Sequence, residues 1–103
     1  MSDRNRDLII DEEVNRALIH AVRSIEVFSL PFRNPKYDLK KIVDNDIDFI
    51  LGAVMNDIMN NSALFLRNRN IRLTPEEIDK LNVYVFSNAG KLKDGIRKIL
   101  DDT

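Results

Sequence analysis

The chain has 103 residues and a mass of 11.9 kDa, a length typical of one domain, here residues 1–103. Hydrophobic residues make up 44% and charged residues 32%, which is typical of a globular protein rather than a disordered one. The net charge of −1 excludes a polycation, and the lack of cysteine excludes disulfides, thiolate metal sites and cysteine nucleophiles. There is no apolar run of membrane-spanning length and no signal-peptide core, so we expect a cytoplasmic protein without membrane contact.

The first predicted helix covers residues 11–28, where apolar residues recur at helical spacing. Asp11 is its predicted N-cap, and the prolines of the 29–37 segment are predicted to end it. The stripe expected to be buried consists of Val14, Ala17, Leu18, Ala21, Val22 and Ile25. His20, the single histidine, lies off this stripe, so we expect a surface residue rather than a metal ligand or catalytic base.

The second predicted helix covers residues 38–68 and has an apolar stripe too wide for one neighbouring helix. Since Phe49 and Leu64 lie outside even this stripe, we expect the chain to form a homodimer through this helix. The predicted dimer interface consists of Phe49, Ile50, Val54, Ile58, Leu64 and Phe65. Gly52 either admits the close approach of another helix or is simply tolerated inside this one.

The clearest helix start is Thr74-Pro75-Glu76-Glu77, a capping box with proline at its preferred first position. It predicts a helix over residues 75–88, followed by another over residues 91–101, with one continuous helix as the alternative. A glycine C-cap at Gly90 would separate the two. No long alternating strand pattern occurs, so the predicted fold is all-α: a bundle of three or four helices with a long central one.

Asp44, Asp46 and Asp48 alternate like the first ligands of a calcium loop. Phe49 stands where that loop needs glycine, and Met55 stands where it needs a bidentate glutamate. Asp44 and Asp48 would share one helix face, which leaves a Mg²⁺-dependent hydrolase as a distant alternative. We therefore expect a protein that is not an enzyme and that uses no metal or cofactor.

Positive charge is concentrated in the connections on either side of the second predicted helix, and no acid lies between Asp57 and Glu76. Arginine and asparagine at this spacing suit contacts to phosphates, bases and sugars, although basic residues also complement a helix dipole and keep loops soluble. The candidate nucleic-acid-binding residues are Arg33, Lys36, Lys40, Lys41, Arg67, Arg69 and Arg72.

The order of these elements resembles the histone fold. The matching features are the long helix over residues 38–68, the extended Asn70–Leu73 step and the helix opened at Thr74–Ile78. The first connection is longer than in that family, and the C-terminal seam extends further. The resemblance implies an antiparallel dimer whose paired connections hold DNA, since in a single chain they lie at opposite ends of a helix about 45 Å long.

We expect a small helical protein-interaction module, such as a regulator, adaptor or assembly subunit, that acts as a homodimer and binds a protein partner. The alternative is a nucleic-acid-binding protein in a histone-like arrangement. The acid-rich first segment favours the interaction module, because it would repel phosphates if it lay near the connections. Its acidic residues are Asp3, Asp7, Asp11, Glu12 and Glu13.

Overall fold

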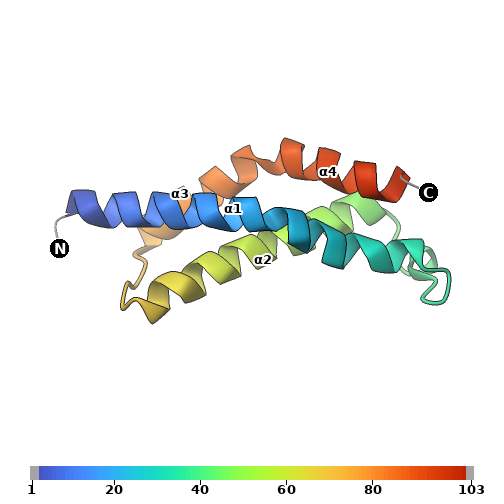
Figure 1. Cartoon of the computed structure of the whole chain (residues 1–103), viewed down its shortest axis with the longest axis horizontal. Coiled ribbons are helices and arrows are strands. Elements are labelled where there is room, and N and C mark those ends of the chain that lie inside the picture. Colours follow the sequence, from blue (N-terminus) through green and yellow to red (C-terminus); the bar gives the residue numbers. More distant parts are fainter. Residues whose placement is uncertain (1–2, 102–103) are drawn as a thin grey trace.

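The computed structural model describes residues 3–101, which form an elongated helical bundle of 51 × 20 × 19 Å (Figure 1). Its elements are α1 (Asp3–Arg33), the 3₁₀ turn η1 (Leu39–Lys41), α2 (Asp46–Asn68), α3 (Pro75–Ser87) and α4 (Ala89–Asp101). Helix α1 runs the length of the molecule, α2 returns antiparallel to it, and α3 and α4 follow one another alongside (Figure 1). Within residues 3–101 there is no strand, which confirms the all-α prediction.

Helix α1 extends beyond the predicted 11–28 range at both ends. Asp11 therefore lies inside the helix and is not its N-cap. The helix also continues through Pro31 to Arg33, although proline lacks the N–H that a helix interior needs. Phe32, one residue later, is buried, and its ring packs against that of Phe49 at a centroid distance of 5.8 Å. Tertiary packing thus outweighs the local cost of the proline.

Helix α2 begins at Asp46 rather than at residue 38, because Asn45 provides the N-cap. The side-chain oxygen of Asn45 accepts a hydrogen bond from the backbone N–H of Asp48 at 3.0 Å. Before this cap, Asp38 has a left-handed backbone conformation with φ of 50°, which redirects the chain into η1. The first part of the predicted second helix is therefore a connection.

The capping box of α3 is confirmed, and Thr74 is its N-cap. The Thr74 hydroxyl accepts from the Glu77 N–H at 3.2 Å, and the Glu77 carboxylate accepts from the Thr74 N–H at 2.9 Å. Helices α3 and α4 are separate, but they part at Asn88 rather than through a glycine cap. Gly90 lies inside α4, and the Asn88 side-chain amide donates to the Tyr84 carbonyl at 2.9 Å.

The core lies where α2 meets α1 and α4. Helix α2 contributes buried residues spaced four apart, namely Ile50, Val54, Ile58, Ser62 and Leu66. Small residues of α1, including Ala17 and Ala21, face this stripe and allow the two helices to pack closely. A second, smaller cluster of Ile10, Leu66 and Ile71 closes the end of the bundle near the α2–α3 connection.

Candidate interaction surfaces

Half of the predicted dimer interface lies in the core of a single chain. Ile50 and Val54 are 0% exposed and Ile58 is 2% exposed. They pack against buried residues of α1 and α4 and therefore offer no surface to a second chain. The width of the α2 stripe reflects several neighbours within the same chain, since α1, α3 and α4 all contact α2.

The other three predicted interface residues are on the surface but form no continuous patch. Phe49 lies beside Phe32 near the start of α2, whereas Leu64 and Phe65 lie near its end. The guanidinium of Arg16 lies 4.5 Å from the centroid of the Phe65 ring, and that of Arg69 lies 5.9 Å from it. Phe65 is thus already partly covered.

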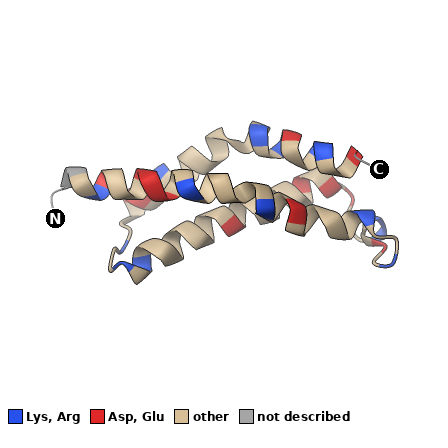
Figure 2. Cartoon of the chain, viewed as in Figure 1, with Lys and Arg blue, Asp and Glu red and all other residues tan. Residues whose placement is uncertain are grey.

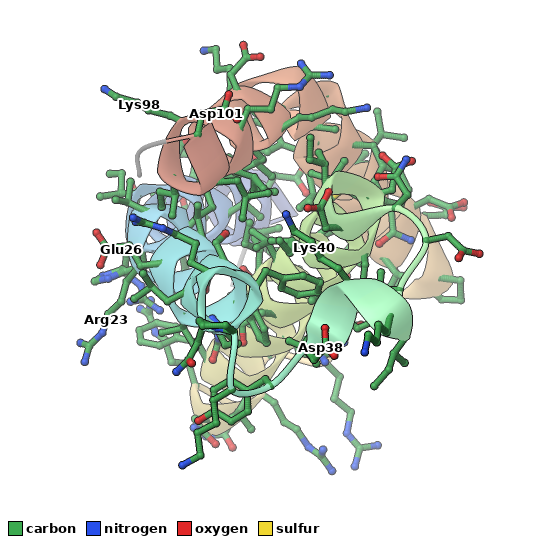
Figure 3. All side chains as sticks on the ribbon, turned by 90° about the vertical axis from the view of Figure 1, so that its right-hand side faces the viewer. Arg23, Glu26, Asp38, Lys40, Lys98 and Asp101 are labelled. Carbon is green, nitrogen blue, oxygen red and sulfur yellow. The ribbon has the colours of Figure 1, made fainter. Side chains whose placement is uncertain are left out.

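Helix α1 carries a line of exposed apolar residues, here called the α1 stripe. Leu8, Ile19, Val22 and Leu30 are each more than half exposed. Leu8, Ile19 and Leu30 recur at eleven-residue intervals, about three helical turns, so they lie in line on one side of the helix. Figure 3 shows Glu26 pointing away from the other helices, and Glu26 shares the face of Ile19 and Leu30 by helical spacing. This stripe points away from the core.

The α1 stripe was missed from the sequence because the predicted helix omitted two of its members. Leu8 and Leu30 lie outside residues 11–28, and Val22 was assigned to the buried stripe. Val22 is instead 64% exposed. The eleven-residue spacing was readable in the sequence once the full length of α1 was known.

The two basic connections lie at opposite ends of the 51 Å body (Figure 2). One end carries Arg33, Lys36, Lys40 and Lys41, and the other carries Arg67, Arg69 and Arg72. In the end-on view of Figure 3, Lys40 lies across the end of the helices, and Lys41 pairs with Asp38 at 3.0 Å. In one chain the two sets do not share a surface. The order of helix lengths also differs from that of the histone fold, because the longest helix is the first one and not the central one.

A groove of about 520 Å³ separates α2 from α3 on the side of α2 that faces away from α1. Apolar side chains line most of it, namely those of Met59, Ala63, Ile71, Leu73, Ile78 and Leu81. The amides of Asn56, Asn60 and Asn82 add polar groups. Arg67 and Arg72, at the end near the α2–α3 connection, are the charged residues that line it in the described part of the chain. The sequence suggested these arginines but not the groove, since it gave no sign that α3 lies beside α2.

Arg6 fixes the end of this groove. Its guanidinium donates two hydrogen bonds to the Glu77 carboxylate, at 2.7 and 2.9 Å, and another to the Arg72 carbonyl. These bonds from Arg6, together with those from Thr74, lower the pKa of Glu77 from 4.5 to about 2 against the opposing effect of burial. Arg6 and Glu77 are 71 positions apart in the chain, so capping rules alone could not reveal this contact.

A second cleft, between α1 and α2, brings His20, Ser24 and Asp57 together. These are the residue types of a hydrolase triad, but the Ser24 hydroxyl donates directly to the Asp57 carboxylate. The Asn61 amide also donates to Asp57, at 3.2 Å. Because no imidazole lies between serine and aspartate, nothing in this arrangement activates Ser24 as a nucleophile. His20 is exposed, as predicted.

The three aspartates near the start of α2 do not converge. Asp46 and Asp48 lie in its first turn, where carboxylates complement the helix dipole, and Asp48 pairs with Lys93 at 3.4 Å. Among the side chains that the structure describes, those of residues 5–101, no three histidine, aspartate or glutamate side chains are grouped so that they could hold a metal ion.

Helix α2 is long and apolar enough to cross a membrane by these two criteria alone. The central helix of a globular bundle has the same character, and α2 supplies five buried residues.

In comparisons with protein-family models, curated proteins and solved structures, the chain matches none of them.

Proposed function

We propose that this chain is a non-enzymatic protein-interaction module that acts as a homodimer, with two copies meeting through the exposed stripe of α1. The observation that carries the proposal is the unpartnered line of Leu8, Ile19, Val22 and Leu30 opposite the core. Apolar surface of this kind usually marks an interface.

The exposed area supports association. The chain exposes 7329 Å², compared with about 6,000 Å² for a compact monomer of its mass. The elongated shape accounts for part of this excess, and the radius of gyration is 15.6 Å, against about 13 Å for a typical domain of this length. A standard interface buries about 800 Å² on each partner, which the excess can supply.

The stripe suits an antiparallel pair of α1 helices. Ile19 lies midway between Leu8 and Leu30, so a twofold axis at Ile19 places Leu8 against the partner's Leu30 at both ends. Glu12 and Glu26 lie between these apolar contacts and face one another across the axis. Their repulsion weakens this dimer and makes it sensitive to their charge.

Sedimentation at micromolar concentration tests this proposal. Wild type should have twice the 11.9 kDa chain mass, and Ile19→Glu should be monomeric with an unchanged circular dichroism spectrum. Glu26→Gln should dimerise more tightly because one repulsive carboxylate is removed. Val83→Glu is the matched control, because Val83 is 68% exposed, close to the 75% of Ile19, but lies on α3. A clean wild-type monomer, or equal effects of Ile19→Glu and Val83→Glu, would contradict the proposal.

The observations support this interaction module over nucleic-acid binding. An antiparallel α1 dimer would bring the first basic connection of one chain to the same end as the second basic connection of the other, so the charge around the second connection distinguishes the two functions. Arg6 brings the start of α1 against that connection. Asp7 and Asp11, on that part of α1, line a cleft with Glu77. The negative charge of this cleft between α1 and α3 disfavours a phosphate backbone on that side of the molecule.

A further inference from the structure

We infer that the groove between α2 and α3 is the docking site for a partner protein, which inserts an amphipathic helix with an acidic end. This inference rests on the proposed interaction function and names the class of partner. The apolar side of the helix would lie on Met59, Ala63 and Ile78, and its carboxylates would reach Arg67 and Arg72.

The dimensions of the groove favour a helix. One side of α2 forms a wall of the groove, through Asn56, Asn60, Ala63 and Arg67. The rise along the helix from Asn56 to Arg67 is about 16 Å, or three helical turns. A helix of that length presents three or four side chains on one face. Ile78 is 44% exposed on the opposite wall and leaves apolar surface for those side chains to cover.

The charge of the groove selects an acidic occupant. Arg67 and Arg72 are its charged lining residues, and neither forms an ion pair within the described part of the chain. Both guanidinium groups are therefore available to carboxylates, with which arginine forms paired hydrogen bonds. Two other clefts differ because they contain acids beside their basic residues: one has Asp57 with Arg16 and Arg23, and the other has Asp7, Asp11 and Glu77 with Lys80.

The groove is accessible and held in shape. Asn56 and Asn60 point toward it, whereas Asp57 and Asn61 line the cleft with α1, so the groove lies on the far side of α2 from α1. A dimer formed through α1 would leave it open. The bonds from Arg6 to Glu77 and to the Arg72 carbonyl hold the groove end before any partner arrives, which lowers the cost of binding.

A peptide library displayed for binding to the full chain tests the inference. Each peptide has about 16 residues, with leucines at helical spacing and random residues, including acids and bases, elsewhere. Selected peptides should carry aspartate or glutamate near one end. In fluorescence anisotropy titrations, the double variant Arg67→Glu, Arg72→Glu should weaken their binding by about tenfold or more. Replacing the peptide acids with lysine should restore binding to that variant.

Arg69→Glu is the matched control, because Arg69 belongs to the same connection but lies over Phe65, outside the groove. It should change binding little, and circular dichroism should show that all variants are folded. The inference is overturned if no peptide is selected, if the double variant binds as wild type does, or if Arg69→Glu weakens binding equally. Ile19→Glu should bind the peptides normally, so failure at the groove and failure of the α1 dimer give different results.

Discussion

At the scale of single residues, Glu77 joins local helix chemistry to tertiary structure. Its carboxylate completes the capping box of α3 by accepting from the Thr74 N–H, and it also pairs with Arg6 of α1. The residue is 9% exposed, so the charge is held mainly by protein partners rather than by water. The start of α3 therefore depends on a residue of the first helix.

The lowered pKa of Glu77 predicts a loss of stability in acid. The fold favours the carboxylate, whose pKa is about 2 instead of 4.5. Its contribution is therefore fully present above the ordinary value and is lost as the pH falls from about 4.5 toward 2. Glu77→Gln should lower the free energy of unfolding at pH 7 by about 2 kcal/mol.

Denaturant unfolding at pH 7 and at pH 3 measures this effect. The difference between wild type and Glu77→Gln should shrink at the lower pH, because protonation removes the same interaction. Glu76→Gln is the control, since Glu76 is exposed and takes no part in the capping box. If the difference in the free energy of unfolding between wild type and Glu77→Gln were the same at both pH values, the contact with Arg6 would not stabilise the charged form of Glu77.

At the scale of elements, glycines distinguish closely packed helices from free surfaces. At Gly95, a Cβ atom would lie 3.2 Å from the Cδ1 atom of Ile25, so α4 approaches α1 closely there. At Gly52, no atom beyond the neighbouring residues and the nearby backbone of α2 lies within 4 Å of such a Cβ. The close helix approach considered for Gly52 from the sequence therefore occurs at Gly95 within the chain.

Alanine substitutions should report this difference. Gly52→Ala should raise the free energy of unfolding by about 1 kcal/mol, because alanine favours a helix and the added methyl meets nothing. Gly95→Ala should gain less, since Ile25 must shift to admit the methyl. Chemical denaturation of both variants measures the two changes. Equal gains would contradict the close approach of α4 to α1.

The boundaries of the helices show where sequence patterns were sufficient to predict the beginning or end of a helix. The start of α3 was predicted from Thr74 and Glu77, because a capping box is a local signal. The C-terminal end of α1 was not, because proline predicts a stop and only packing of residues such as Phe32 overrides it. Its N-terminal end was missed because Asp11, which lies inside the helix, is also a typical N-cap residue. Asn45 is a standard N-cap residue, but the apolar spacing before it suggested an earlier helix start.

At the scale of the whole molecule, the distribution of charge bears on the alternative of nucleic-acid binding. We expect wild type to give no salt-sensitive gel shift with duplex DNA or RNA at about 150 mM salt, because the acidic start of α1 lies beside the second basic connection and opposes phosphate contacts on that side. The measurement is repeated at lower salt with Arg67→Glu and Lys40→Glu. A tight shift that both variants weaken would reverse this interpretation and favour nucleic-acid binding.

The sequence by itself determined the helical class, the start of α3 and the acid-free basic segment, because these depend on residues close together in the chain. Only the tertiary structure decided which neighbour, if any, covers each apolar face. Residues Ile50, Val54 and Ile58 are covered by α1 and α4, whereas Leu8, Ile19 and Leu30 are left exposed. An apolar stripe shows that a partner is needed but not which one, since that depends on which distant helices pack beside it. The groove between α2 and α3 and the contact from Arg6 to Glu77 were decided in the same way.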